Sequence, residues 1–168
     1  GWLCDCLHAS PGQSAEDAVP DDALRPNQLL AVTLGAAKDP ALQRAIVSSC
    51  EELLVPGAIR SLADRSVKHA IPVALNGRLL NDPHNPFWGR YEGDEDTRRK
   101  PAYHNGTAWV WRAPSYGEAL YLTYGGAARD TALAILSAGA QTAGRGCLGF
   151  LPEIVDGNAP HVPRGCGA

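Results

Sequence analysis

Three short polar segments carry the residues of this chain that could do chemistry. They are residues 25–28, residues 103–111 with two tryptophans, and residues 149–157 around Glu153. Glycines and prolines bracket Glu153, which indicates a loop beyond a helix and not a solvated helical face. Sugar-processing sites combine a carboxylate, polar groups for hydroxyls and aromatic platforms. We therefore interpret Glu153 as the candidate catalytic residue of a glycosidase site, or of half of one.

The other candidate residues have both a binding and a structural interpretation. His104 could bind a sugar hydroxyl, with Asn105 capping the helix that follows, or could be a loop histidine without a ligand. Trp109 and Trp111 stand two apart on an expected helix, so at most one can line a site, and Trp109 is nearer the loop. Further candidates for substrate binding are Arg25, Asn27, Arg60 and Tyr103.

These further candidates also have ordinary alternatives. Arg25 or Arg60 could instead hold a structural ion pair, because a guanidinium forks equally well onto a carboxylate. Asn27 could be a helix-start residue, and Asp156 beside Gly157 is typical of a turn, so it stays outside the catalytic set.

Composition excludes several classes of protein. The 168 residues are 45% hydrophobic and 20% charged, which is ordinary for one globular domain. The net charge of -3 gives no footprint for nucleic acid, since the basic residues 98–100 follow an acidic run. No apolar stretch approaches the roughly 20 residues of a membrane span, and no signal segment begins the chain. We expect a soluble, cytoplasmic protein without a membrane or nucleic-acid partner.

The ends and the cysteines lead to two further expectations. The chain begins with glycine and contains no methionine, so we expect a piece of a longer protein, incomplete at both ends. Five cysteines without a signal peptide argue against a disulfide framework. Cys4 and Cys6 are too close together for the usual zinc-knuckle spacer, so the sequence predicts buried structural thiols, with no metal and no cofactor.

Hydrophobic periodicity predicts two helix hairpins separated by a long excursion. One helix starts at Pro26 and ends near Gly35, and a second starts after the N-cap Asp39 and runs to about residue 54. Residues 55–104 show no sustained period and many prolines, which indicates an ordered, site-building excursion. A third helix is expected over 109–124, kinked at Pro114, and a fourth over 127–143.

No alternating pattern of useful length appears, so the sequence predicts an all-α architecture. Helix hairpins joined by long loops are more typical of an αα-toroid, whose rim loops build the site, than of a compact bundle with short turns.

At the three polar segments the chain resembles the C-terminal catalytic domain of glycogen debranching enzymes, the amylo-α-1,6-glucosidase family. Each motif alone is weak, but together they follow the order of the family over nearly the whole chain. The matching segments are 25–28, 56–62, 91–93, 103–107, 151–153, 156–157 and 165–166. Val110 and residues 112–114 depart from the family pattern, which puts the local helix geometry in doubt more than the function.

The resemblance implies a partial (α/α)6 barrel, of which this chain supplies the later helices. It also implies cofactor-free, inverting hydrolysis of α-1,6 branch stubs in a glycogen-like α-glucan, with Glu153 at the position of the general base. The general acid of such enzymes lies earlier, in the preceding N-terminal part of the same polypeptide, so this chain alone is expected to be marginally stable and inactive. Alternatives are another six-hairpin glycosidase, similar to glucoamylase or trehalase, or a non-catalytic glucan-binding module.

Overall fold

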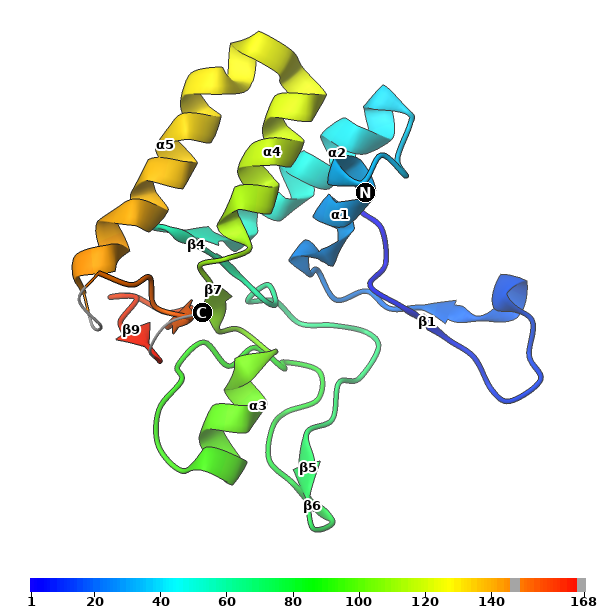
Figure 1. Cartoon of the computed structure of the whole chain (residues 1–168). Coiled ribbons are helices and arrows are strands. Elements are labelled where there is room, and N and C mark those ends of the chain that lie inside the picture. The colour runs from blue at the N-terminus through cyan, green and yellow to red at the C-terminus, as the bar shows by residue number, and fades with distance from the viewer. Residues whose placement is uncertain (146–148, 166–168) are drawn as a thin grey trace.

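A helical layer forms one side of the molecule. The computed structural model describes residues 1–145 and 149–165, so the candidate segment 165–166 is only half covered, and Cys147 and Cys166 lie outside. Figure 1 shows α4 and α5 lying side by side, with α1 and α2 next to α4, which packs against all three. We call these four helices the helical layer: α1 (Leu29–Thr33), α2 (Pro40–Cys50), α4 (Ala113–Tyr124) and α5 (Arg129–Ala140).

Local signals set the start of α2, as predicted. The Asp39 carboxylate accepts hydrogen bonds from the backbone N–H groups of Ala41 and Leu42, at 3.0 and 3.3 Å, and Pro40 occupies the first turn. The helix then buries one apolar face in the main hydrophobic core. That core is contributed by α1, α2, α4 and their flanks, and it contains Leu24, Leu29, Val32, Ile46, Val47, Cys50, Leu53, Ile59 and Tyr116.

A five-stranded antiparallel sheet lies next to one end of the helical layer (Figure 1). The prediction of an all-α, (α/α)6-type chain is therefore wrong for the described residues. The strand order of the sheet is β3-β4-β7-β8-β9. The strands are β3 (Leu54–Val55), β4 (Ala58–Arg60), β7 (Ala108–Trp109), β8 (Ile154–Val155) and β9 (Pro163–Arg164). Strands of two or three residues are too short to produce the alternation by which a sheet is found in sequence.

The excursion over 55–104 is ordered, as expected, and returns to the sheet. Beyond β4 it forms the hairpin of β5 (Ala74–Leu75) and β6 (Arg78–Leu79). A π-helical turn over Glu95–Arg99 then leads into the single turn of α3 (Lys100–Tyr103). At the other end of the chain, β1 (Leu7–His8) pairs with β2 (Val19–Pro20) in an arm that projects from the body (Figure 1).

The prediction of a kinked helix over 109–124 is wrong at its start. Trp109 ends strand β7, and α4 begins only at Ala113, so Pro114 lies in the first turn, where a missing N–H costs nothing. Gly125 ends the helix, as predicted, with a φ of 62° that only glycine adopts readily. None of the helices in the described ranges is long and apolar enough to cross a membrane.

Candidate active site

The sheet brings the three polar segments together. Trp109 on β7 is registered between Ile59 on β4 and Ile154 on β8. The ladder continues one step beyond β8, where the Val110 N–H lies 3.5 Å from the Glu153 carbonyl oxygen. Segments about fifty residues apart in sequence therefore meet on adjacent short strands, and Glu153 is held at the edge of a strand and not in a free loop.

An aromatic cluster surrounds Tyr103 beside Glu153. The Tyr103 ring meets Trp109 edge-on, with centroids 4.5 Å apart, and Tyr91 at 5.7 Å. The His104 ring is stacked on Trp109 with an interplanar angle of 16°. The Tyr103 hydroxyl donates a hydrogen bond to Glu153 Oε1. Burial, followed by this carboxylate, raises the pKa of Tyr103 to about 12, so the phenol keeps its proton and remains a donor at neutral pH.

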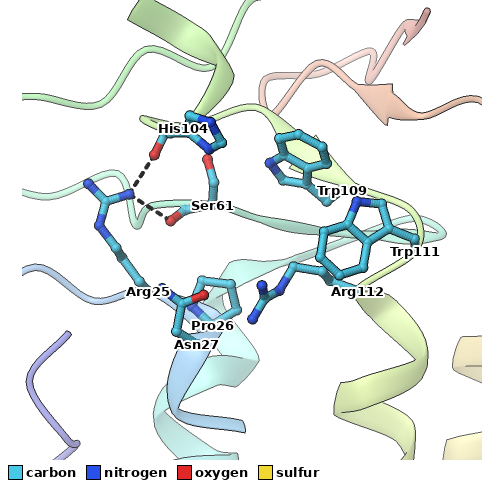
Figure 2. Close-up of a pocket in the computed structure, with 8 residues that line it drawn as sticks. All are labelled: Arg25, Pro26, Asn27, Ser61, His104, Trp109, Trp111 and Arg112. Atoms are coloured by element: carbon cyan, nitrogen blue, oxygen red, sulfur yellow. Dashed lines mark hydrogen bonds between the residues drawn. The ribbon is translucent and has the colours of Figure 1, made fainter. Parts of the chain in front are cut away.

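A cavity of about 130 Å³ opens next to this cluster. Figure 2 shows the two indoles on one side of it and Arg25 on the other. Its lining comes from residues 25–27, residue 61 and residues 104–112, and not from the segment around Glu153. It consists of Arg25, Pro26, Asn27, Ser61, His104, Trp109, Trp111 and Arg112. Trp109 is buried and Trp111 is half exposed. The expectation that at most one of them lines a site is wrong, because residues 109–111 form a strand end and a turn instead of a helix.

Arg25 ties the walls of this cavity to one another. Its Nη1 donates to the Ser61 carbonyl at 3.1 Å and also to the His104 carbonyl (Figure 2). Its Nη2 donates to Asn105 Oδ1 at 3.1 Å. The Asp5 carboxylate lies 3.7 Å from Nε. One guanidinium thus contacts three segments, because its donors are spread over three nitrogens in a planar fork.

The remaining candidates divide between the cavity and its supports. Asn27 lines the cavity and donates to Asp5 Oδ1 at 2.6 Å. Asn105 does not cap the next helix, which begins much later; its side chain instead donates to the Pro101 carbonyl at 2.9 Å. Arg60 is not among the cavity-lining residues, since its Nε donates to the Gly157 carbonyl at 2.9 Å and its guanidinium lies over Phe87.

Glu153 and Tyr103 stand behind the cavity wall. Neither residue lines the cavity. The Tyr103 ring contacts the wall residues Trp109 and His104, and its hydroxyl contacts Glu153. The structure thus brings four predicted residues to the cavity, namely Arg25, Asn27, His104 and Trp109. It places Glu153 behind them, separated from the cavity by the wall residues Trp109 and His104 and by Tyr103.

A buried ion pair below Glu153 was not predicted. Asp156 is buried, and Arg164 contacts both of its carboxylate oxygens, with Nη2 2.9 Å from Oδ2. The Tyr91 N–H donates to Oδ1 at 2.9 Å. The contacts with Arg164 and Tyr91 use both carboxylate oxygens, so Asp156 joins three segments of the chain. No sequence pattern marks the pairing, because Arg164 comes from a separate strand.

A second polar cluster was also missed, at the base of the N-terminal arm. Cys6, His8 and Asp21 point toward one another there and line a cavity of about 460 Å³, which shares Arg25, Asn27 and His104 with the first. The cluster contains one cysteine and one histidine, so it forms no Cys or His pair with metal-ligand spacing. The available signal was the spacing of Cys6 and His8, because residues two apart in a strand share a face.

Comparison with known proteins agrees with the motifs. A family model described as amylo-alpha-1,6-glucosidase matches residues 6–168. No curated protein and no solved structure matches the chain significantly. The match covers nearly the whole length and includes every residue that lines the first cavity. The chain therefore belongs to the amylo-alpha-1,6-glucosidase family, a glycoside hydrolase family whose substrates are glucans.

Proposed function

We propose that this chain carries the base half of an inverting amylo-α-1,6-glucosidase site, which releases glucose from α-1,6 branch stubs of a glycogen-like glucan. The observation that carries the proposal is the Glu153 carboxylate, oriented by the Tyr103 hydroxyl, next to an aromatic and polar cavity. Membership of the family supports the reaction class.

Glu153 would act as the general base. Its Oε1 accepts the Tyr103 hydrogen bond, which leaves Oε2 to take a proton from the attacking water. The water oxygen bonds to the anomeric carbon as the glycosidic C–O bond breaks, and a general acid protonates the departing oxygen. Inversion requires the two carboxyl groups to lie about 6.5–9.5 Å apart, so that the water fits on the face opposite the leaving group.

The cavity would bind the glucosyl unit. The Trp109 and Trp111 indoles offer apolar surfaces for the C–H face of a sugar ring, while Arg25 and Asn27 contribute donors for hydroxyls (Figure 2). Trp109 and His104 line the cavity, and Tyr103 lies behind them in contact with Glu153. We therefore assign Tyr103 a positioning role toward Glu153.

The general acid would come from the preceding part of the same polypeptide, as the family resemblance implies. The activity test therefore uses the polypeptide that carries this chain together with that acid. Glucose release from a branched limit dextrin is measured for wild type and for Glu153→Gln. A general base contributes about 10²- to 10⁴-fold, so we expect a loss of that size in kcat with dextrin binding retained.

Glu118→Gln is the matched control, because Glu118 is an exposed carboxylate on α4, away from the cavity lining. It should leave glucose release unchanged. Tyr103→Phe keeps the ring and removes the hydrogen bond to Glu153, so it should lower kcat less than Glu153→Gln does. Full activity in Glu153→Gln would remove Glu153 from the mechanism.

A non-catalytic glucan-binding role is the second candidate, because the cavity is lined by aromatic and polar groups while Glu153 stands behind it. The two roles separate in one comparison. If the chain only binds glucan, Trp109→Ala weakens dextrin binding, whereas Glu153→Gln changes neither binding nor glucose release.

A further inference from the structure

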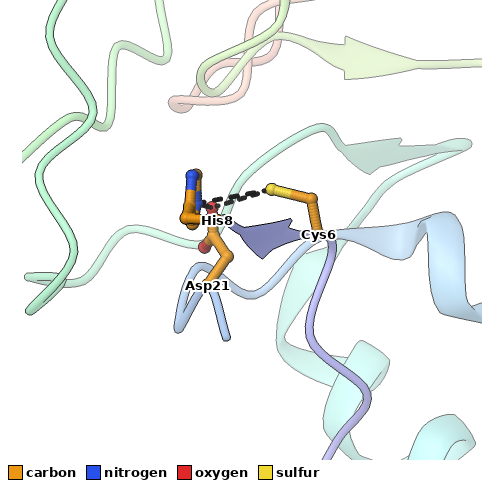
Figure 3. A group of neighbouring side chains, drawn as sticks. All are labelled: Cys6, His8 and Asp21. Atoms are coloured by element: carbon orange, nitrogen blue, oxygen red, sulfur yellow. Dashed lines mark hydrogen bonds and ion pairs between the residues drawn. The ribbon is translucent and has the colours of Figure 1, made fainter. Parts of the chain in front are cut away.

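We propose that Cys6, His8 and Asp21 bind a Zn²⁺ ion at the base of the N-terminal arm, with three protein ligands and a fourth position on the side of the adjoining cavity. Figure 3 shows the thiol, the imidazole and the carboxylate directed at one another. The proposal is independent of the glucosidase assignment, because none of these residues belongs to the lining of the first cavity.

The arm positions the three side chains by its strand register. Leu7 pairs with Pro20 and His8 with Val19, so Cys6 comes opposite Asp21, whose N–H donates to the Cys6 carbonyl at 2.9 Å. Cys6 directly precedes β1 and His8 ends it, so the two residues stand two apart on extended chain and project from the same face. The hairpin of the arm thus brings the three ligand residues together.

The separations of the three ligand atoms fit a tetrahedral zinc centre. His8 Nε2 and Asp21 Oδ2 are 3.3 Å apart, and Cys6 Sγ lies 3.4 Å from the first and 3.7 Å from the second. With Zn–S near 2.3 Å and Zn–N or Zn–O near 2.0 Å, tetrahedral angles give about 3.3 Å between N and O and about 3.5 Å from sulfur to either. One ion can therefore reach all three atoms with little movement of the side chains.

The types of ligand select the metal. Mg²⁺ and Ca²⁺ prefer oxygen donors, whereas a mixed set of thiolate, imidazole and carboxylate suits Zn²⁺. The Cys6 thiol would release its proton to solvent on binding. Zn²⁺ sites with three protein ligands commonly keep a fourth position for water or another small ligand.

Neighbouring groups orient two of the ligands. Asp21 Oδ1 accepts a hydrogen bond from the Ala23 N–H at 2.6 Å, which fixes the carboxylate and leaves Oδ2 for the ion. The His8 ring is stacked on His69, with centroids 3.5 Å apart and an interplanar angle of 14°. The Asp22 carboxylate holds the segment of His69 through its N–H at 2.9 Å. The hydrogen bond to Asp21 is of the kind that orients a ligating carboxylate.

The same geometry argues against a Cys-His-Asp proton relay. A relay needs the thiol and the carboxylate on different ring nitrogens, so that the imidazole passes a proton between them. Here Cys6 Sγ and Asp21 Oδ2 both contact His8 Nε2. Three ligand atoms that converge on one point are instead the arrangement that binds a metal ion.

The test is metal binding by the full chain, after removal of metal with a chelator. Titration calorimetry with Zn²⁺ should show one strong site, and Co²⁺ as a spectroscopic probe should show a thiolate-to-cobalt charge-transfer band. Loss of a supporting contact costs up to about 100-fold in affinity, so loss of a ligand should cost more than about 100-fold. We expect this for Cys6→Ser, His8→Gln and Asp21→Asn.

Cys4→Ser is the matched control, because Cys4 lies two residues away on the same segment and is outside the cluster. It should bind Zn²⁺ as wild type does. Circular dichroism of each variant verifies that it is folded, and Cys6→Ser is the decisive variant because it removes one sulfur atom from an exposed residue. Wild-type affinity in Cys6→Ser, or a Co²⁺ spectrum without the thiolate band, would overturn the proposal.

Discussion

The helical layer and the half of the molecule that carries the site are held together by different kinds of contact. In the helical layer, neighbouring helices bury aliphatic side chains such as Leu29, Ile46 and Leu53 in one core. In the site half, which comprises the five-stranded sheet, α3 and the loops over 56–112 and 149–165, side chains bind distant backbone groups. Arg60 bound to the Gly157 carbonyl is an example, and Arg25, from the segment before α1, binds the His104 carbonyl in the same half. Local periodicity can therefore predict the helical layer. The site half depends on contacts between residues far apart in sequence, which no local pattern indicates.

The largest effect on stability should come from the core of the helical layer. Ile46 is fully buried in the main core, and Ile46→Ala should lower the free energy of unfolding by about 4 kcal/mol, because it removes buried methyl groups and leaves a cavity. Leu34→Ala is the control, since Leu34 is 78% exposed and should change stability by less than about 0.5 kcal/mol. Urea unfolding measures both. If the two variants lost equal free energy of unfolding, the face of the helical layer that carries Leu34 would be covered in solution.

The site half should be sensitive to the loss of one polar partner. Asp156→Asn removes the buried charge that Arg164 contacts, and we expect a loss of about 3 kcal/mol, at the lower end of the range for buried pairs because Arg164 keeps some exposure. Glu92→Gln is the matched control, because Glu92 pairs with the same Arg164 at the surface. Surface pairs contribute less than about 1 kcal/mol.

The contrast between Asp156 and Glu92 tests the comparison directly. If both substitutions cost the same in urea unfolding, the buried polar contacts of the site half are no more important than surface ones, and the distinction between the two regions fails.

The sequence predicted what local rules determine. The Asp39 N-cap, the apolar face of α2 and the end of α4 at Gly125 all depend on neighbours within a few residues, and the structure confirms them. It could not predict the sheet, because each strand has two or three residues and is stabilised by partners far away. The same cause explains the site. Residue types identified Arg25, His104 and Trp109 as candidates, but only the fold shows Glu153 behind Tyr103.

The smallest of the expected effects concerns a single local signal in the helical layer. Asp39→Ala removes the side chain that accepts the N–H groups of Ala41 and Leu42, and should lower the free energy of unfolding by about 1 kcal/mol. Asp39→Asn keeps an acceptor at the same place and should remain close to wild type. Thermal unfolding measures the pair. A loss in Asp39→Asn as large as in Asp39→Ala would assign the effect to charge and not to the cap.

The short strands of the sheet also have a kinetic consequence. The sheet requires Ile59 to pair with Trp109 and Ala108 to pair with Val155, and these partners are about fifty residues apart in sequence. The hydrogen bonds of α2, in contrast, join residues four apart. Chain segments that are distant in sequence meet slowly, because the loop between them loses entropy before contacts compensate for it. The helices can therefore form early, while the five-stranded sheet that positions Glu153 is completed late in folding.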